Sequence, residues 1–150
     1  QVHWMAFEKR EDVHRLAGMV ADFMKLMLPA ATDEASARRT KRLVEAWDEG
    51  RDRLLRDAPH LVLVHGQADL PSIEADCVIA LTYFELYAYA KGLGTCWAGY
   101  FRTAANLHGP LISALGLPAG HQCYGAVMIG YPKYRYVRIP RRNPPLTTWR

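Results

Sequence analysis

The sequence predicts one globular domain that combines α-helices with β-strands, and three observations support this. The chain has 150 residues, of which 50% are hydrophobic and 23% are charged, a balance typical of a folded domain. Apolar residues recur at helical spacing in some segments and form short alternating or branched runs in others. No composition shift, repeat or low-complexity segment divides the chain. We therefore expect residues 1–150 to form a single domain, and the composition excludes collagen, coiled-coil and disordered structures.

The first part of the chain predicts a strand followed by two helices. Residues 2–7 alternate as in a strand, and residues 13–27 have apolar positions three and four apart, as in an amphipathic helix. A second helix is expected from Thr32 or Asp33, either of which could cap it, to the break at 57–59. Its inward residues are expected to be Leu43, Val44, Trp47, Leu54 and Leu55. Its outer face carries charges of both signs, which we interpret as a solvated surface.

The middle of the chain predicts a buried strand and an unusually apolar helix. Residues 60–65 form a short run rich in branched residues, as in a buried strand, and histidines stand at both its ends. Residues 77–90 contain only Thr82 and Glu85 outside the hydrophobic set. A helix that is apolar all round must be buried all round. This requires either a central position within its own chain or a partner subunit, and we favour a dimer. Glu85 needs a hydrogen-bonded partner in either case.

The last third predicts a turn, a short helix, a strand and an extended tail. Gly92-Leu93-Gly94 indicates helix termination. Residues 95–101 set small residues among aromatic ones, which predicts an extended segment that a flat group could approach closely. A short helix opened by Pro110 and closed near Gly116 and a strand over 122–129 follow. Three prolines in residues 140–145 exclude a helical tail.

Positive charge is concentrated in the tail. The chain carries 19 Lys and Arg against 15 Asp and Glu. Residues 133–150 hold six of these bases and no acid, so the tail carries +6 and the body −2. This distribution favours a local anion contact over a general affinity for polyanions. An alternative is that Tyr134, Arg135, Tyr136, Arg138, Arg141, Arg142 and Trp149 form a basic and aromatic surface for single-stranded nucleic acid.

Motifs for several kinds of chemistry are absent. The sequence has no GxSxG, HExxH, GxxxxGK[ST] or dinucleotide-binding glycine fingerprint. Its three cysteines, Cys77, Cys96 and Cys123, have no CxxC spacing and indicate neither a disulfide framework nor a zinc ribbon. No metal site is expected. A planar anionic cofactor with chemistry of its own suits an aromatic chain with a small-residue segment and an arginine tail.

From residue 57 onward the chain resembles the FMN-dependent nitroreductase family. The resemblance depends on the order and spacing of several motifs over about residues 57–149. They are the apolar strand after Ala58-Pro59, the helix end Glu85-Leu86-Tyr87-Ala88-Tyr89-Ala90-Lys91, Gly92-Leu93-Gly94-Thr95-Cys96-Trp97-Ala98-Gly99, Leu115-Gly116-Leu117-Pro118-Ala119-Gly120, Ile129-Gly130-Tyr131-Pro132, Tyr136-Val137-Arg138-Ile139-Pro140-Arg141-Arg142, and Trp149. Residues 1–56 fit the family's strand-helix-helix order.

The resemblance implies an α+β fold with a mostly antiparallel central sheet surrounded by helices, a homodimer, and one FMN in each of two interface sites. Cys96, Trp97, Ala98 and Gly99 would lie against the flavin, with the backbone N–H of Ala98 or Gly99 reaching the ring nitrogen that accepts hydride. Arg142, together with Arg138, would bind the phosphate, because a guanidinium can grip a phosphate bidentately. Tyr100 and Phe101 would flank the substrate. No side-chain acid or base is required.

The implied activity is reduction of nitroaromatic, quinone or similar acceptors with electrons from NAD(P)H, by a ping-pong scheme through the flavin. The partners are then a second copy of the chain and small molecules, with no nucleic acid or membrane. The family's N-terminal phosphate-binding segment should precede Gln1, and we expect it to have been lost from this chain. The motifs also resemble members fused to an N-terminal iron-sulfur ferredoxin module. With no signal peptide or membrane-spanning run, we expect a cytoplasmic location.

Overall fold

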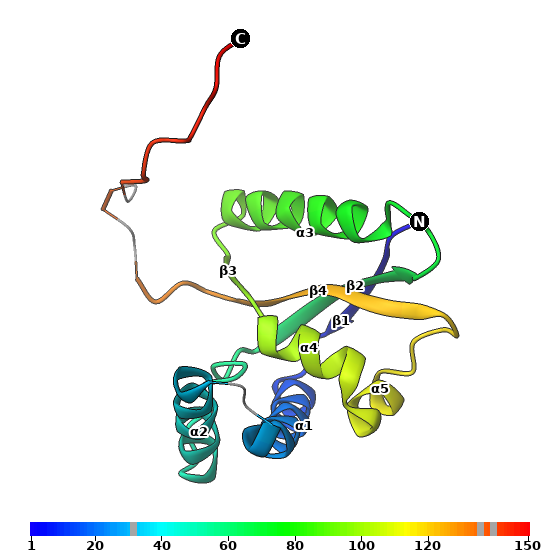
Figure 1. Ribbon diagram of the computed structural model, residues 1–150, viewed down its shortest axis with the longest axis vertical. Helices are drawn as coiled ribbons and strands as arrows, with labels where there is room; N and C mark the ends of the chain where they lie inside the picture. Colours follow the sequence, from blue (N-terminus) through cyan, green and yellow to red (C-terminus); the bar gives the residue numbers. More distant parts are fainter. Residues whose placement is uncertain (31–32, 135–136, 139–140) are drawn as a thin grey trace.

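A four-stranded antiparallel sheet forms the centre of the fold. The computed structural model describes residues 1–30, 33–134, 137–138 and 141–150. The strands are β1 (His3–Phe7), β2 (His60–Gln67), β3 (Gly94–Trp97) and β4 (His121–Gly130), in the spatial order β1-β2-β4-β3. Helices cover both faces of the sheet (Figure 1). The predicted α+β fold with an antiparallel sheet is therefore confirmed.

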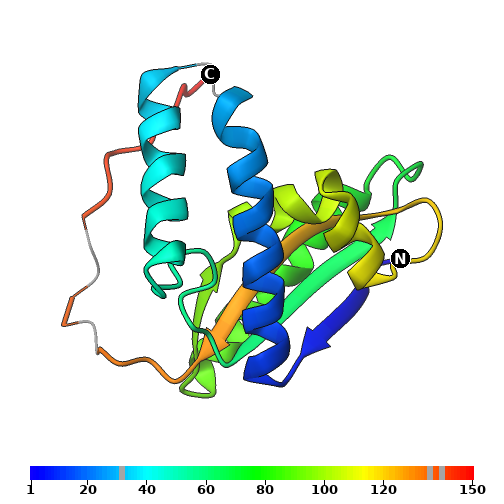
Figure 2. The ribbon, with the colours of Figure 1, turned by 90° about the horizontal axis from the view of Figure 1, so that it is seen from below.

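The helices are distributed unequally over the two faces of the sheet. One face is covered by α1 (Arg10–Met27), the 3-10 turn η1 (Leu28–Ala30), α2 (Glu34–Asp48), α4 (Gly99–Leu107) and α5 (Gly109–Leu115). The helix α3 (Ile73–Ala90) lies alone on the other face. Figure 2 shows α1 and α2 side by side, antiparallel to each other. The molecule thus has three layers, with the sheet in the middle.

Alternating side chains of the central strands supply two separate cores. Leu61 and Leu63 of β2 point to the layer of α1, α4 and α5, whereas Val62 and Val64 point to α3. Because successive residues of a strand face opposite sides, a strand with helices on both faces is apolar throughout. This explains the continuous apolar run that predicted β2. A bulge interrupts its pairing with β4 between Val64 and His65.

The second predicted helix begins as expected but ends earlier. Asp33 caps α2, accepting a 2.8 Å hydrogen bond from the backbone N–H of Ser36. The helix ends at Asp48, near Gly50 with its positive φ of 77°, rather than at residues 57–59. Leu54 and Leu55 are buried as predicted, but a loop carries them inward. Thr32 lies outside the described residues.

The segment after β3 was predicted incorrectly as extended through Phe101. The strand stops at Trp97 and α4 begins at Gly99. Phe101 and Ala104 are buried at helical spacing in the core beside α1, and this packing favours the helix. The short helix α5 agrees with the prediction, and Gly116 closes it with a φ of 58°.

Helix α3 is buried on only one side within the described chain. Cys77 and Leu81 pack against the sheet, while Ile79, Tyr83 and Leu86 are 66%, 74% and 66% exposed. The described residues of its own chain therefore do not surround this helix. A contiguous apolar surface of this kind is characteristic of protein interfaces.

None of the helices in the described part of the chain is both long enough and apolar enough to cross a bilayer.

Candidate functional site

The candidate site is built on the turn that joins β3 to α4. Ala98 separates the two elements, and its N–H donates a 2.8 Å hydrogen bond to the carbonyl of Ala126 on β4. This bond holds the turn against the central sheet. Ala98 is buried, whereas Gly99 is exposed and a Cβ there would meet nothing within 4 Å. The N–H of Gly99 opens the first turn of α4 and has no backbone acceptor among the described residues.

The sequence did not decide whether the backbone N–H of Ala98 or that of Gly99 would contact the ligand. The N–H of Ala98 is already used by the sheet, and a helix leaves the N–H groups of its first turn without intrahelical partners. Gly99 is therefore the residue whose N–H is available. Backbone without a side chain also permits close approach by a planar group.

Two cavities flank this turn. One, of about 420 Å³, is lined among others by Trp97, Ala98, Gly99 and Tyr100. The other, of about 540 Å³, is lined among others by Cys96. Arg56 and Met128 contribute to both cavities. Cys96 thus lines one of these cavities, and Trp97 to Tyr100 line the other.

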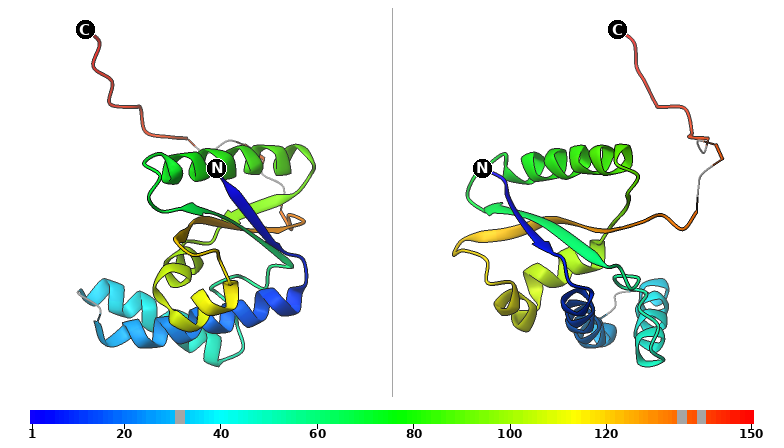
Figure 3. Two further views of the ribbon diagram at one scale, coloured as in Figure 1. Left: turned by 90° about the vertical axis from the view of Figure 1, so that its right-hand side faces the viewer. Right: turned by 180° about the vertical axis from the view of Figure 1, so that it is seen from behind.

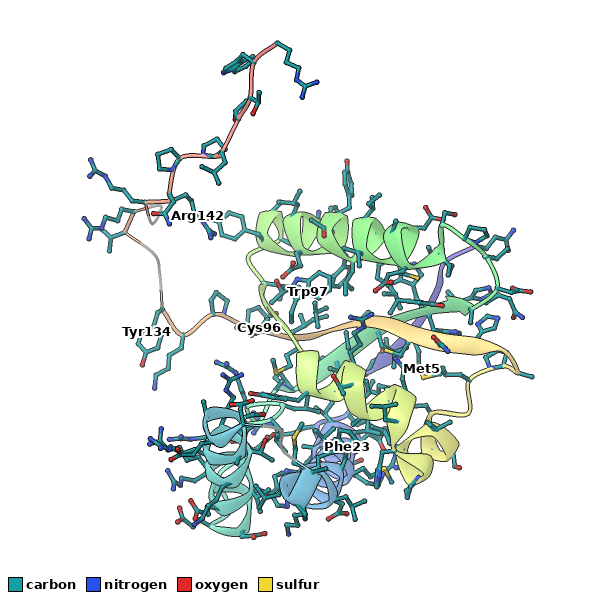
Figure 4. All side chains as sticks on the ribbon, in the orientation of Figure 1. Met5, Phe23, Cys96, Trp97, Tyr134 and Arg142 are labelled. Atoms are coloured by element: carbon teal, nitrogen blue, oxygen red, sulfur yellow. The ribbon has the colours of Figure 1, made fainter. Side chains whose placement is uncertain are left out.

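Glu85 of α3 was not among the predicted site residues but forms hydrogen bonds with one of them, Trp97, and with the preceding Thr95. Its carboxylate accepts a 2.8 Å hydrogen bond from the hydroxyl of Thr95 and another from the indole N–H of Trp97. Trp97 lies on the α3 side of the sheet (Figure 4). The need of Glu85 for a hydrogen-bonded partner was visible in the sequence, and these two donors meet it. Glu85 thereby fixes the orientation of β3 at the site.

Phe101 does not lie at the surface of the site. Its side chain is fully buried among the residues that join α1, α4 and the sheet. A side chain in that position anchors α4 and cannot touch a substrate in the flanking cavities. Tyr100 is half-buried against the same core and is the aromatic residue of this pair that lines the 420 Å³ cavity.

A strained loop between α2 and β2 supplies cations to the site. Arg56 and Asp57 have φ values of 57° and 53°, a left-handed conformation uncommon for residues with a side chain. The buried carboxylate of Asp52 accepts hydrogen bonds from the N–H groups of Leu54, Leu55 and Asp57 at 2.8, 2.8 and 3.1 Å. These bonds hold the loop in place, and Arg56 reaches both cavities.

Comparison with known proteins identifies the family. A sequence model described as the Nitroreductase family matches residues 1–131. The chain belongs to the nitroreductase family. This membership makes flavin-dependent oxidoreduction the class of its activity. No curated protein matches the sequence.

Solved nitroreductase structures share the fold. A nitroreductase with bound FMN from Desulfitobacterium hafniense is 21% identical, with a TM-score of 0.69 over 99% of this chain and 74% of its own. One with bound FMN from Bacteroides fragilis is 19% identical, with a TM-score of 0.67 over 98% and 74% of the two chains. An iodotyrosine deiodinase bound to FMN and 3-iodo-L-tyrosine is 19% identical, with a TM-score of 0.57 over 97% and 74%.

The two arginines predicted to bind phosphate are not brought to the turn. Arg138 and Arg142 are exposed, and the described parts of the tail extend away from the three layers (Figure 3). Figure 4 shows Arg142 well apart from Cys96 and Trp97. Of the predicted basic and aromatic surface, Arg135 and Tyr136 lie outside the described residues.

The three cysteines of the chain differ in accessibility. Burial raises the pKa of the Cys123 thiol to about 12 and also raises the pKa of Cys77, so both remain thiols at neutral pH. Cys96 is partly buried and lies at the candidate site.

A histidine cluster forms at the end of the sheet where β2 meets the start of β4. The rings of His3, His65 and His121 have centroids 5.0 to 5.4 Å apart, and the Nδ1 atoms of His65 and His121 are 2.9 Å apart. Burial, followed by the charges of the other two histidines, lowers the pKa of His65. Among the described residues, no group of three or more His, Cys, Asp or Glu is arranged to hold a metal ion.

Proposed function

We propose that the protein is an FMN-dependent oxidoreductase that reduces nitroaromatic, quinone or similar acceptors with electrons from NAD(P)H. Family membership supports the class of chemistry. We place the flavin site at the turn around Gly99, because exposed backbone lies there between two cavities. In this proposal residues 1–150 act as one domain.

The residues at the turn suit a flavin. FMN needs a flat surface for its ring, a hydrogen-bond donor near the ring nitrogen and cations for its phosphate. The open space beside Gly99 and its available N–H meet the first two needs. Cys96, Trp97 and Ala98 complete the surface in this proposal, and Trp97 is kept in place by Glu85.

The tail arginines supply the phosphate contact in this proposal. Arg138 and Arg142 carry charge without a partner in the ion pairs of the described residues. Guanidinium groups bind phosphate through two parallel hydrogen bonds. These arginines can contact a flavin at Gly99 only if the tail reaches such a site. In a dimer, the tail of one subunit could wrap around the other subunit and reach the flavin site there.

The chemistry at such a site requires little from the side chains. FMN, when bound, accepts two electrons from the donor and passes them to the acceptor. Tyr100 flanks the position where donor and acceptor bind in turn, and the Gly99 N–H stabilises negative charge next to it. Because both reactants use the same place, initial rates measured against both substrates are expected to give the parallel lines of ping-pong kinetics.

The exposed face of α3 supports a homodimer. Ile79, Tyr83 and Leu86 are spaced four and three residues apart and form one apolar stripe on this helix. We expect Tyr83→Arg to produce a monomer in sedimentation velocity, because a charge would be desolvated in the interface. Ser113→Arg, at an exposed position of α5 on the opposite face of the sheet, is the matched control. A Tyr83→Arg variant that stays dimeric contradicts this interface.

The flavin assignment is tested by filling the open space at the turn. Gly99→Val places a side chain where nothing lies within 4 Å, so the fold is preserved, and Gly109→Val does the same at the start of α5. We expect Gly99→Val to weaken FMN binding at least tenfold, measured by quenching of flavin fluorescence, and Gly109→Val to bind as the parent does. A parent protein that neither carries nor takes up FMN would refute the proposed function. Equal affinity in both variants would remove Gly99 from the site.

A further inference from the structure

An arginine-lined groove lies between α2 and the loop that follows it. It has a volume of about 680 Å³ and is lined by the polar and charged residues Asp33, Glu34, Arg38, Arg39, Arg42 and Arg53, together with Ala35 and Leu43. Four guanidinium groups therefore share one concave surface with two carboxylates. The sequence interpretation treated this helix face as ordinary solvated surface.

The two carboxylates leave most of this positive charge unbalanced. Glu34 pairs with Arg38 at 2.5 Å, and the carboxylate of Asp33 is used to cap the helix at the N–H of Ser36. Arg39, Arg42 and Arg53 have no ion pair among the described residues. Like charges held close together repel one another, and a multiply charged anion bound between them removes that repulsion.

The charges outside the groove behave differently. Lys41 lies on the same helix and pairs with Glu45 at 3.8 Å, and Arg51 in the following loop pairs with Glu49. On α2, the excess of positive charge is therefore confined to the groove. It does not extend over α2 as a whole.

The arginines of the groove are carried by rigid backbone. Arg39 and Arg42 are three residues apart on α2, which packs on α1 through Trp47 at a ring-centroid distance of 5.1 Å from His14. Arg53 follows Asp52, whose buried carboxylate holds the loop by three backbone hydrogen bonds. A cation fixed in this way loses less conformational entropy when it binds a ligand.

The groove adjoins the candidate flavin site. Arg53 lines both this groove and the 420 Å³ cavity that contains Trp97, Ala98 and Gly99. A ligand lying across Arg53 would place one end at the turn and the other between Arg39 and Arg42. Its far end should carry a dianion, and its near end should be the part that exchanges electrons.

We propose that this groove binds the 2′-phosphate of NADPH, and that the protein therefore uses NADPH in preference to NADH. This inference rests on the proposed function, in which a reduced nicotinamide donates electrons at the turn. NADPH and NADH differ only in a phosphate remote from the nicotinamide ring. A phosphate dianion between Arg39, Arg42 and Arg53 forms charge-assisted hydrogen bonds that the hydroxyl of NADH cannot replace.

Calorimetric titration of the purified protein with four probes tests the groove without measuring turnover. We expect NADP⁺ to bind at least tenfold more tightly than NAD⁺, and 2′,5′-ADP at least tenfold more tightly than 5′-AMP. Both preferences should decrease as the salt concentration rises. Inorganic phosphate is a further probe: if it binds as tightly as 2′,5′-ADP, the groove is a general phosphate site and the proposal for NADPH is overturned.

Matched variants test whether the preference for NADP⁺ depends on the arginines of the groove. The double variant Arg39→Gln with Arg42→Gln should lose at least tenfold in affinity for NADP⁺ while its affinity for NAD⁺ stays the same. Arg51→Gln, which removes a paired arginine outside the groove, should change neither. Equal affinities of the parent for NADP⁺ and NAD⁺, or a similar effect of Arg51→Gln, would overturn the proposal.

Visible absorbance of bound FMN is recorded on the same samples. FMN binding without a preference for NADP⁺ refutes only the groove, whereas a preference without FMN binding refutes only the flavin assignment.

Discussion

Replacement of Asp52 by alanine tests how the loop beside the site is held. The side chain is 8% exposed, and its two oxygens accept three backbone hydrogen bonds at 2.8, 2.8 and 3.1 Å. Loss of an acceptor from a buried donor costs about 1–3 kcal/mol. Water can reach the partly buried N–H of Asp57, so we expect Asp52→Ala to lower the free energy of unfolding by about 2–4 kcal/mol in total. For a domain of this size the melting temperature should fall by roughly 10 °C.

Asp52→Asn provides a graded comparison. Its amide oxygen can keep the bonds to Leu54 and Leu55, but its amide nitrogen cannot accept from the N–H of Asp57, so the loss should be about 1 kcal/mol. Urea unfolding followed by circular dichroism measures both values, with an unchanged denaturant slope. Asp12→Ala, at an exposed carboxylate paired with Arg15, should change stability by less than about 0.5 kcal/mol. The reasoning fails if Asp52→Ala is as stable as this control, or if Asn and Ala are equally damaging.

Three further predictions concern the sheet, the histidines and the tail. Gly125→Ala would place a Cβ 2.8 Å from Leu81 and should cost about 1–3 kcal/mol by overpacking, whereas Gly109→Ala should be tolerated; equal stabilities in urea contradict this. Because the pKa of His65 is lowered from its ordinary 6.5, the unfolded chain binds the proton more readily, and the free energy of unfolding should fall as the pH drops below that value. The decrease should be smaller in His65→Gln, and an unchanged pH profile would show that His65 is not responsible. Deletion of residues 133–150 should abolish both FMN binding and dimerisation; a truncated protein that remains dimeric and yellow rules this out.

The elements with a clear hydrophobic period could be predicted from the sequence. Residues 2–7 form β1 and the run from residue 60 forms β2, because an alternating pattern suits a strand with one covered face and a continuous apolar run suits a strand covered on both faces. The start of α2 was also predictable, since a capping aspartate acts on a backbone N–H only three residues away. Local physics was sufficient in these cases.

Predictions failed where contacts distant in sequence decide the structure. Leu54 and Leu55 keep a helical spacing from Trp47, yet the backbone donors around them bond to Asp52 and α2 ends earlier. The small and aromatic residues over 95–101 predicted an extended segment, whereas Gly99 begins α4 and Phe101 packs into the core as part of this helix.

The details of the candidate site depend on contacts that the sequence does not show. The choice of Gly99 over Ala98 depends on a bond to Ala126 in another strand. The groove depends on which arginines remain unpaired after Glu34 and Asp33 have taken partners. Neither pairing can be deduced from spacing.

The order of the strands has a consequence for how the molecule folds. The two central strands, β2 and β4, pair with each other, although residues 68–120, with α3, β3, α4 and α5, lie between them in the chain. The entropy of closing so long a loop opposes this pairing until the intervening helices have packed. No part of the chain that contains only one of these strands can form the centre of the sheet. We therefore expect a slow, cooperative folding transition, in which the turn at Gly99 forms only when β2 and β4 have paired.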